Sequence, residues 1–441
     1  IKLSRGAGFE MHSHPTNVLW ITPGLKFHST LPLITNFKSI WLYSWANFYK
    51  HSAILENVLQ DSVSHMTGYD SYNDFNLFAN NPDYSTSFFT QSLEPDNSFD
   101  FDQSNAGLAL LSSNFELIFG KFKSNFGPFQ RGNLSISDYA PAFNQFLLKL
   151  KFNKLNFTYL LGKLNSNIPR NLLCGDDQPI IIGEENIHSD FWDWGDCSDW
   201  WPGSNELSDD RYTEFNRYIA HHRIDILPQK NIRIGLYEQV IFGGRDIAFN
   251  YMIPVVPFWS VQHESGDTDN IMMGIDFEVV FGNTENESNR FYSALLIDEW
   301  APYDTFEDNN RNWFAYQIGY SRNAKIFGKD FLFKIEYAKI EPEVYNHRFI
   351  INEPKHFGYN LGFWSGRNSD DTIVKFILLI NENSYVDLGC EYTRFSNDNY
   401  VSSLETQYKS NNVDFLSGND YWFRKKGYIS YSTLLKYSLF L

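Results

Sequence analysis

The sequence contains no long hydrophobic run. Nowhere do apolar residues continue for the roughly 18 to 20 positions that a transmembrane helix requires. Apolar residues still make up 43% of the 441 residues, so they are dispersed along the chain. This dispersion excludes a membrane helix but is typical of a β-barrel, because each strand of a barrel turns only about five side chains toward lipid, in alternation with polar ones.

Cysteine and basic residues are also scarce. The 3 cysteines, Cys174, Cys197 and Cys390, are too few for a disulfide scaffold and fit no zinc-site spacing. Cys174 and Cys197 fall in one long loop and are a candidate disulfide in an oxidising compartment. The chain has 36 Lys and Arg against 53 Asp and Glu, a net charge of -17. This balance argues against nucleic acid as a partner, because phosphate binding needs clustered cations.

Motifs of catalysis and of cofactor binding are missing as well. The sequence has no Walker loop, no Gly-x-Ser-x-Gly and no His-Glu-x-x-His. Acidic residues recur at every third position at Asp190, Asp193, Asp196 and Asp199, but without the glycine and terminal glutamate of an EF-hand loop. We therefore predict no cofactor, no metal site and no catalytic residues, and a protein that is not an enzyme.

Aromatic residues, by contrast, are abundant at 18%, with 40 Phe, 26 Tyr and 12 Trp. Apolar and polar residues alternate in segments of about ten residues, the length of a tilted membrane strand. In 271–281, for example, Ile275 and Phe277 share one face while Asp276 and Glu278 share the other. Comparable alternation runs through 154–164, 217–227, 331–341, 373–381, 384–394 and from Ile429 to Leu441. These segments predict membrane-spanning strands, with aromatic girdles at the two interfaces.

The predicted connections are unequal in length. Those near 30–34, 111–113, 152–154 and 227–230 are tight, whereas those near 50–98, 123–141, 165–215 and 397–426 are long and are expected to face outward. Segment 243–268 is either a strand plus a turn or one folded loop, and 398–426 is long enough to hide a further strand. We predict one domain over 1–441, an all-β, transmembrane, antiparallel β-barrel of about 18 strands. Its lumen is expected to be obstructed by extracellular loops.

The predicted location is the bacterial outer membrane, with outer-membrane lipid as a partner. The sequence opens at Ile1 in polar, strand-like residues rather than in a signal peptide, so we expect a mature, processed chain; a truncated chain would open in the same way.

The 165–215 loop has the most unusual composition. It contains 12 Asp and Glu against 2 Arg. Tryptophan faces stack on sugar rings and carboxylates accept hydrogen bonds from sugar hydroxyls, so the loop is a candidate glycan-binding site. The alternative is that the tryptophans pack the loop into the barrel mouth as a plug. The residues assigned to glycan binding are Trp192, Trp194, Trp200, Trp201, Asp193, Asp196 and Asp199.

Other charged residues are predicted to order the loops or the lumen. Segment 217–227 places Arg217, His221, Arg223 and Asp225 on its polar face. Histidine beside aspartate suggests catalysis, but no nucleophile accompanies them in the sequence, and wide barrels carry charged ladders inside. Segment 259–270 is polar and turn-rich, and either lines the lumen or binds a ligand. The loop-ordering set is completed by Arg131, His263 and Asp267.

Two stretches resemble the capsule-assembly family typified by Wzi. The first is Gly120-Lys-Phe-Lys-Ser-Asn-Phe-Gly-Pro-Phe-Gln-Arg-Gly-Asn-Leu-Ser-Ile-Ser-Asp-Tyr-Ala-Pro141, similar to the family's Trp-Gly-Pro, Arg-Gly-Ser-Leu and Ser-Asp-Asn-Ala-Pro order. Phe126 stands where the family usually has Trp, and Asn133 where Ser is common. The second runs from Tyr218 through Glu238, Gly243-Gly-Arg245 and Trp259-Ser-Val-Gln-His263 to Gly266-Asp-Thr-Asp-Asn270, and continues to Leu296-Ile-Asp-Glu299. Together the two stretches cover about 100 to 340.

This resemblance implies an obstructed barrel of eighteen strands that acts as a surface lectin and binds capsular polysaccharide. Two other functions remain open. A substrate-selective pore would conduct ions in discrete steps, and a structural outer-membrane subunit of a larger surface assembly would purify with partner proteins.

Overall fold

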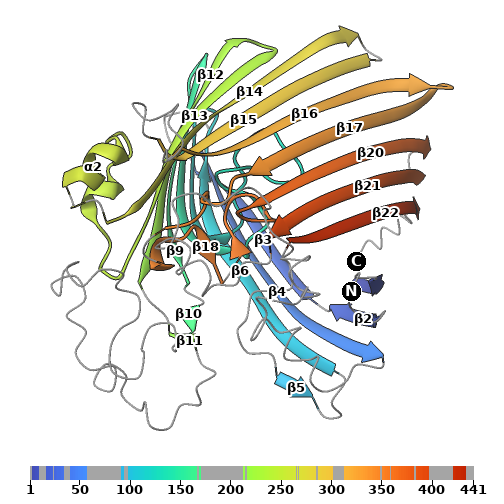
Figure 1. The fold of residues 1–441 in the computed structure, drawn as a ribbon, viewed down its shortest axis with the longest axis horizontal. Helices are drawn as coiled ribbons and strands as arrows, with labels where there is room; N and C mark the ends of the chain where they lie inside the picture. The colour runs from blue at the N-terminus through green and yellow to red at the C-terminus, as the bar shows by residue number, and fades with distance from the viewer. Residues whose placement is uncertain are drawn as a thin grey trace.

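The computed structural model is built almost entirely of β-strands (Figure 1). The residues that it describes are 2–8, 16–22, 24–33, 40–56, 91–93, 98–165, 168–169, 212–213, 216–264, 266, 268–284, 287–300, 312–347, 350–357, 359–381, 384–396 and 421–433.

The strands of the first half are β1 (Lys2–Gly8), β2 (Thr16–Thr22), β3 (Gly24–Leu33), β4 (Ile40–Glu56), β5 (Gln91–Leu93), β6 (Ser98–Leu111), β7 (Phe115–Phe122), β8 (Phe143–Lys151), β9 (Leu155–Leu164), β10 (Ile168–Pro169) and β11 (Tyr212–Thr213). Those of the second half are β12 (Arg217–Gln229), β13 (Ile232–Gly243), β14 (Asn270–Thr284), β15 (Glu287–Glu299), β16 (Trp313–Ile326), β17 (Lys329–Ile340), β18 (Lys355–His356), β19 (Tyr359–Asn360), β20 (Ser369–Asn381), β21 (Ser384–Ser396) and β22 (Tyr421–Thr433). Among the described residues, three short helices accompany them: η3 (Phe249–Met252), α2 (Phe258–Glu264) and η5 (Ile350–Asn352).

One antiparallel sheet contains 18 of these strands. Strands that follow one another in the chain are mostly neighbours, and β2 and β3 pair with successive parts of β4. At the two ends of the described sheet, β1 pairs with β2 and β22 with β21, and no described residues join β1 to β22, so the sheet is not closed over this part of the chain. The predicted all-β, antiparallel barrel architecture is confirmed, with the sheet open between β1 and β22 over the described residues.

The two faces of the sheet differ in polarity, and the polar face is the buried one. On β14, Ile275 and Phe281 are 41% and 46% exposed, whereas Asp276 between them is 2% exposed. On β17, Ile335 is 38% exposed and its neighbour Glu336 is 3% exposed. A water-soluble protein buries the opposite set. A barrel with lipid outside and a polar interior is expected to show this arrangement.

Connections at the two ends of the strands differ as the sequence predicts. Tight turns join β6 to β7, β8 to β9, β12 to β13 and β16 to β17 at one end. The opposite end has the long connections, among them segments 124–142, 244–269 and 341–368. Three of the predicted long loops are partly strand: β4 continues to Glu56, β10 and β11 fall within 165–215, and β22 begins at Tyr421. β22 overlaps the last strand predicted from Ile429, so the further strand considered within 398–426 stays a prediction. Segment 243–268 is a folded loop that contains η3 and α2.

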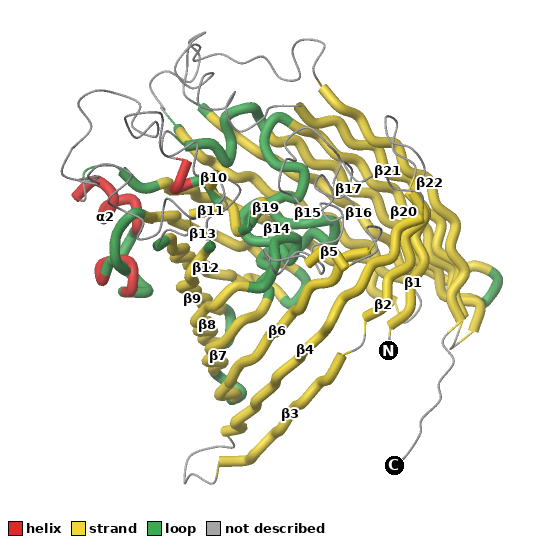
Figure 2. The backbone as a smooth tube through the Cα atoms, turned by 90° about the horizontal axis from the view of Figure 1, so that it is seen from below, coloured by secondary structure: helices red, strands yellow, loops and turns green. Residues whose placement is uncertain are grey.

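Two of these connections fill the concave side of the sheet. Segment 124–142, between β7 and β8, and segment 341–368, between β17 and β20, pack against each other and against the inner face of the sheet (Figure 2). Their buried residues include Phe126, Leu134, Ile136, Tyr345 and Phe363, each with at most 9% of its surface exposed. The predicted long loop 123–141 thus starts at the end of the strands that has the long connections and folds into the interior, where its apolar side chains and its arginine find partners.

Candidate functional site

The segment that enters the interior first is shaped by a tight local motif. Gly127 has a φ of 139°, and a Cβ there would lie 2.1 Å from Asn133 Oδ1. The same oxygen accepts a hydrogen bond from the Phe129 amide at 3.1 Å. Only glycine fits such a close approach, so Gly127 and Asn133 together fold the chain back on itself. This turn presents the next residues, Gln130 and Arg131, to the sheet.

The backbone at the tip of this turn is held by a single carboxylate. The amides of Gln130 and Arg131 donate to the two oxygens of Glu336 on β17, at 3.2 Å and 2.9 Å. The hydroxyl of Tyr292 on β15 donates to the same carboxylate at 2.7 Å. Glu336 is thereby buried with its hydrogen bonds satisfied, as a buried charge requires.

The Arg131 side chain continues the attachment to two further strands. Its guanidinium pairs with Asp371 on β20 at 3.2 Å and with Glu391 on β21 at 3.0 Å. It also lies over the ring of Trp364, 4.8 Å from the centroid, in a cation–π contact. Burial disfavours the charged form, but the Asp371 and Glu391 carboxylates outweigh it and raise the pKa of Arg131 above its usual value. Arg131 is therefore a charged latch between this segment and the wall.

Aromatic and backbone contacts extend the attachment around the interior. Phe126 stacks on His221 of β12 with ring centroids 5.0 Å apart, and Phe129 meets Tyr292 of β15 edge to face at 4.8 Å. The side-chain amide of Gln317 on β16 donates to the Gly132 carbonyl at 2.9 Å. Segment 124–142 thus contacts the inward faces of β12, β15, β16, β17, β20 and β21.

Segment 341–368 closes over segment 124–142 from the other side. The Tyr345 hydroxyl donates to the Leu134 carbonyl at 2.6 Å, and the Ser137 amide donates to the Leu361 carbonyl at 2.7 Å. The Arg217 guanidinium on β12 donates to the carbonyls of Ile351 and Glu353. The two segments are therefore joined to each other as well as to the wall.

His356 in segment 341–368 is a buried histidine close to two cations. Its Nδ1 accepts a hydrogen bond from the Asn165 amide at 3.0 Å. Burial, and then the positive charges of Arg217 and Lys121, lower the pKa of His356 to about 3. The ring is therefore neutral at physiological pH.

A second set of charges lies on the wall. Arg223 on β12 donates to Asp225 at 2.9 Å and 2.6 Å, and also to Asp276 on β14. Arg233 on β13 donates to Glu278 at 3.0 Å. Arg290 joins the wall to the inner segment, because it donates both to Glu278 and to the Pro128 carbonyl, the latter at 2.7 Å. Such carboxylate–guanidinium pairs anchor chain segments, and each partner uses its hydrogen-bonding capacity on the other.

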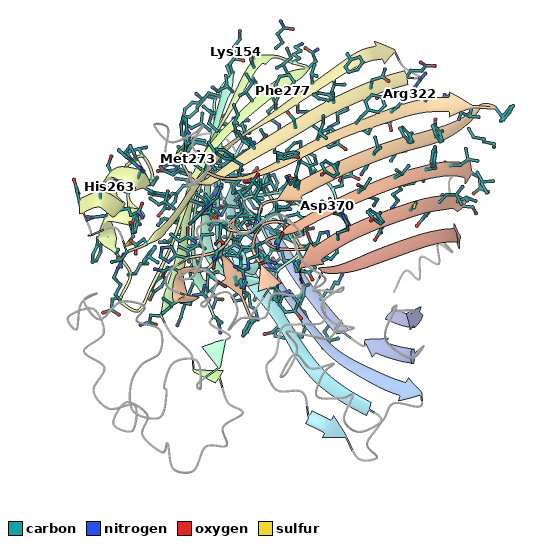
Figure 3. The ribbon with its side chains drawn as sticks, in the orientation of Figure 1. Lys154, His263, Met273, Phe277, Arg322 and Asp370 are labelled. Carbon is teal, nitrogen blue, oxygen red and sulfur yellow. The ribbon has the colours of Figure 1, made fainter. Side chains whose placement is uncertain are left out.

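Most of the residues predicted to order the loops or the lumen line this interior. Arg131, Arg217, His221, Arg223 and Asp225 all contact it, as described above. His263 lies instead on α2 beside Trp259, on the outer side of the sheet (Figure 3). The remaining predicted residues fall outside the described part of the chain: Asp267, Trp192, Trp194, Trp200, Trp201, Asp193, Asp196, Asp199, Cys174 and Cys197.

Three acidic residues that bind Arg131 were not assigned a role from the sequence. Glu336 and Glu391 alternate with apolar residues in the predicted strands, which places them on the polar face but does not name their partner. Asp371 begins the same pattern in its own strand. The available signal was the charge itself, because a carboxylate facing the interior of a membrane barrel needs a cation or amide partner.

Among the residues that the structure describes, no group of three or more His, Cys, Asp or Glu side chains is arranged to hold a metal ion. Within the same residues, no helix has the length and apolar character needed to cross a membrane.

Comparison with known proteins gives likenesses of structure only. No protein-family model matches the sequence. No curated protein matches it either. Among solved structures, the chain is similar to Wzi, described as a carbohydrate-binding β-barrel involved in group 1 capsule assembly in Escherichia coli, with 12% identity, 88% of this chain and 73% of that chain covered, and a TM-score of 0.48.

Two other solved structures resemble this chain with comparably low sequence identity and TM-score. For OccAB4 of Acinetobacter baumannii, identity is 10%, coverage is 89% of this chain and 81% of that one, and the TM-score is 0.42. For OprD of Pseudomonas aeruginosa, identity is 7%, coverage is 88% and 78%, and the TM-score is 0.36. At TM-scores below 0.5, these likenesses do not assign a function.

Proposed function

We propose that this chain is a non-enzymatic β-barrel of the bacterial outer membrane that binds surface or capsular polysaccharide and helps to anchor it at the cell surface. The observation that carries the proposal is the occupied interior. Segments 124–142 and 341–368 are attached to the inward faces of the strands by buried ion pairs and hydrogen bonds. A barrel so filled is suited to hold a ligand on its surface rather than to pass it through.

The ligand class is inferred from the sequence. The 165–215 loop interleaves Trp192, Trp194, Trp200 and Trp201 with twelve acidic residues, which matches the stacking and hydrogen-bonding needs of sugars. This loop joins β9 to β12, so it belongs to the end of the strands that has the long connections. The same end bears the two segments that occupy the interior.

The deciding experiment measures binding of the purified, detergent-solubilised chain to the polysaccharide of its own host cell. A variant with Trp192, Trp194, Trp200 and Trp201 all replaced by alanine is expected to stay folded and to lose binding. The matched control is Trp41→Ala/Trp300→Ala, which removes two tryptophans that are 42% and 53% exposed elsewhere, and which is expected to bind normally. Equal binding by the quadruple variant would contradict the loop assignment.

A planar-bilayer recording of the same protein tests the pore alternative. We expect no conductance steps from the native chain, because the inner segments occupy the interior. Discrete steps from the native chain, together with no polysaccharide binding, would favour a substrate-selective pore. Copurification from native membranes with fixed partner proteins, again without polysaccharide binding, would favour a structural subunit.

A further inference from the structure

Most of segment 244–269 lies outside the sheet, and its end meets an inner segment where the Asn352 side-chain amide donates to the Thr268 carbonyl at 2.8 Å. It leaves β13, forms η3 and α2, and lies against the outer face (Figures 1 and 2). The Tyr159 hydroxyl on β9 donates to the Tyr251 carbonyl at 2.7 Å, and Phe258 stacks on His222 of β12 at 4.2 Å. His222 points outward, because its neighbour His221 points inward and stacks on Phe126.

The outer face beneath this segment has a charged residue. On β13 the outward-facing positions from the tight turn onward are Ile232, Ile234 and Leu236, and then Glu238. The apolar series is thus much shorter than the roughly 9 to 11 residues of a membrane-spanning strand. On the neighbouring β14, outward-facing residues stay apolar from Ile271 to Phe281. A carboxylate turned toward lipid is unfavourable, so Glu238 must be covered by other parts of the protein that separate it from lipid.

Segment 244–269 supplies that cover and donates hydrogen bonds to the carboxylate. The amides of Phe258 and Trp259, at the start of α2, donate to the two Glu238 oxygens at 2.9 Å and 2.7 Å. His222 Nε2 lies 2.9 Å from the same carboxylate. Tyr251, Phe258 and Val261 then pack over the wall in a buried apolar cluster.

The outer surface of the segment is itself apolar. From Ile247 to Gln262 the chain contains no Asp, Glu, Lys or Arg. Large apolar side chains are nevertheless exposed along it: Phe249 78%, Val255 76%, Trp259 54%, Ile253 48% and Met252 39%. The wall residues next to it are exposed to a similar degree, with Leu236 at 43% and Ile275 at 41%. The apolar surface of the segment therefore continues the apolar outer face of the sheet.

We propose that segment 244–269 is a membrane-seated element, and that the bilayer, at the boundary between head groups and acyl chains, is what covers its exposed apolar side chains. Its exposed apolar surface is continuous with the lipid-facing wall. The segment takes the place of the wall where Glu238 interrupts it, and Trp259 is the amphipathic residue type that favours this boundary. This assignment goes beyond polysaccharide binding and does not depend on it.

The test places an environment-sensitive fluorophore at Val255→Cys in a chain whose native cysteines are replaced by serine, reconstituted as single barrels in phosphatidylcholine nanodiscs. Ile275→Cys on the lipid-facing wall is the positive control, and Lys154→Cys in the tight turn between β8 and β9 is the aqueous control. Nitroxide-labelled phosphatidylcholine reports contact with lipid and iodide reports contact with water. Folding of each variant is checked by circular dichroism and by heat-dependent mobility on gels.

We expect the probe at position 255 to be quenched by the nitroxide lipid as strongly as the probe at position 275, and to be shielded from iodide relative to position 154. Quenching by iodide as strong as at position 154 would overturn the proposal. Shielding from iodide without quenching by lipid would also overturn it, and would point to a protein partner.

A second measurement leaves the native cysteines in place, because the serine background removes the candidate Cys174–Cys197 disulfide. Brominated phosphatidylcholine quenches nearby tryptophans, so the contribution of Trp259 is the difference between the native chain and Trp259→Phe. We expect Trp259→Phe to reduce the fraction of fluorescence that brominated lipid quenches. An unchanged quenched fraction would contradict the proposal.

Discussion

Arg131, in the segment between β7 and β8, forms an ion pair with Asp371 on β20, with its Nε 3.2 Å from the carboxylate oxygen. The two residues are 240 positions apart in the chain. A second pair, to Glu391 on β21, binds the same guanidinium to the next strand. Because the partners lie on the wall and Arg131 lies on an inner segment, these contacts hold segment 124–142 against the wall.

Replacing Arg131 with methionine is expected to loosen segment 124–142. The Asp371 and Glu391 side chains, 2% and 6% exposed, lose their cation, and a buried pair broken in this way costs about 3 to 5 kcal/mol. We expect a lower thermal unfolding midpoint and the appearance of conductance steps in planar bilayers. The matched control is Arg322→Met, whose pair with Glu287 is about half exposed and is expected to change stability by less than about 0.5 kcal/mol. A silent Arg131→Met barrel of native stability would show that Arg131 is not a latch.

Gly235→Ala is expected to disturb the charged network on β12 and β14. A Cβ at this position would lie 1.9 Å from Arg223 Nη2 and 2.9 Å from Asp276 Oδ1. The guanidinium must then move away from Asp276, and we expect a loss of about 1 to 3 kcal/mol in unfolding free energy. Chemical denaturation of Gly235→Ala, Arg223→Ala and the double variant checks the cause. If the clash with Arg223 is responsible, the two losses are far from additive; additive losses would contradict it.

His356 gives stability a predictable dependence on pH. Its folded pKa of about 3 lies below the value of 6.5 expected for an exposed histidine, so the unfolded chain binds a proton that the folded chain rejects. The contribution of the neutral His356 ring to the free energy of unfolding is fully present above pH 6.5. It is lost as the pH falls toward 3, by up to about 1.4 kcal/mol per pH unit.

His356→Gln is expected to retain an acceptor for the Asn165 amide while removing the titration. The difference in unfolding midpoint between pH 7 and pH 4.5 should therefore be smaller in His356→Gln than in the native chain. Circular dichroism melts at the two values check this. The same pH dependence in both proteins would assign the effect to other groups.

The candidate Cys174–Cys197 disulfide is tested by counting thiols in denatured protein. Cys390 is a free cysteine in the structure and serves as the internal standard. We expect maleimide to label one thiol per unreduced chain and three after reduction, read by intact mass. Three labels before reduction would exclude the disulfide.

Several features of the fold are readable from the sequence because the physics behind them is local. Alternation fixes which side chains share a face of a strand, so 271–281, 331–341 and 373–381 identify β14, β17 and β20 and place Glu336 on the polar face. The uncharged stretch from Ile247 to Gln262 is equally visible in the sequence. The role of this stretch cannot be read from the sequence, because a lone apolar loop is compatible with a plug, an interface or a lipid contact.

The sequence by itself determined an antiparallel sheet with one apolar and one polar face, since the period of a strand is a property of each residue and its nearest neighbours. Only the tertiary structure decided which long connections turn inward and which turns outward. Segment 124–142 enters the interior because Arg131 meets Glu391 across 260 positions of chain. Segment 244–269 stays outside because Glu238 and His222, which face away from the interior, hold it there. Such pairings depend on how distant strands are brought together, and no local pattern specifies them.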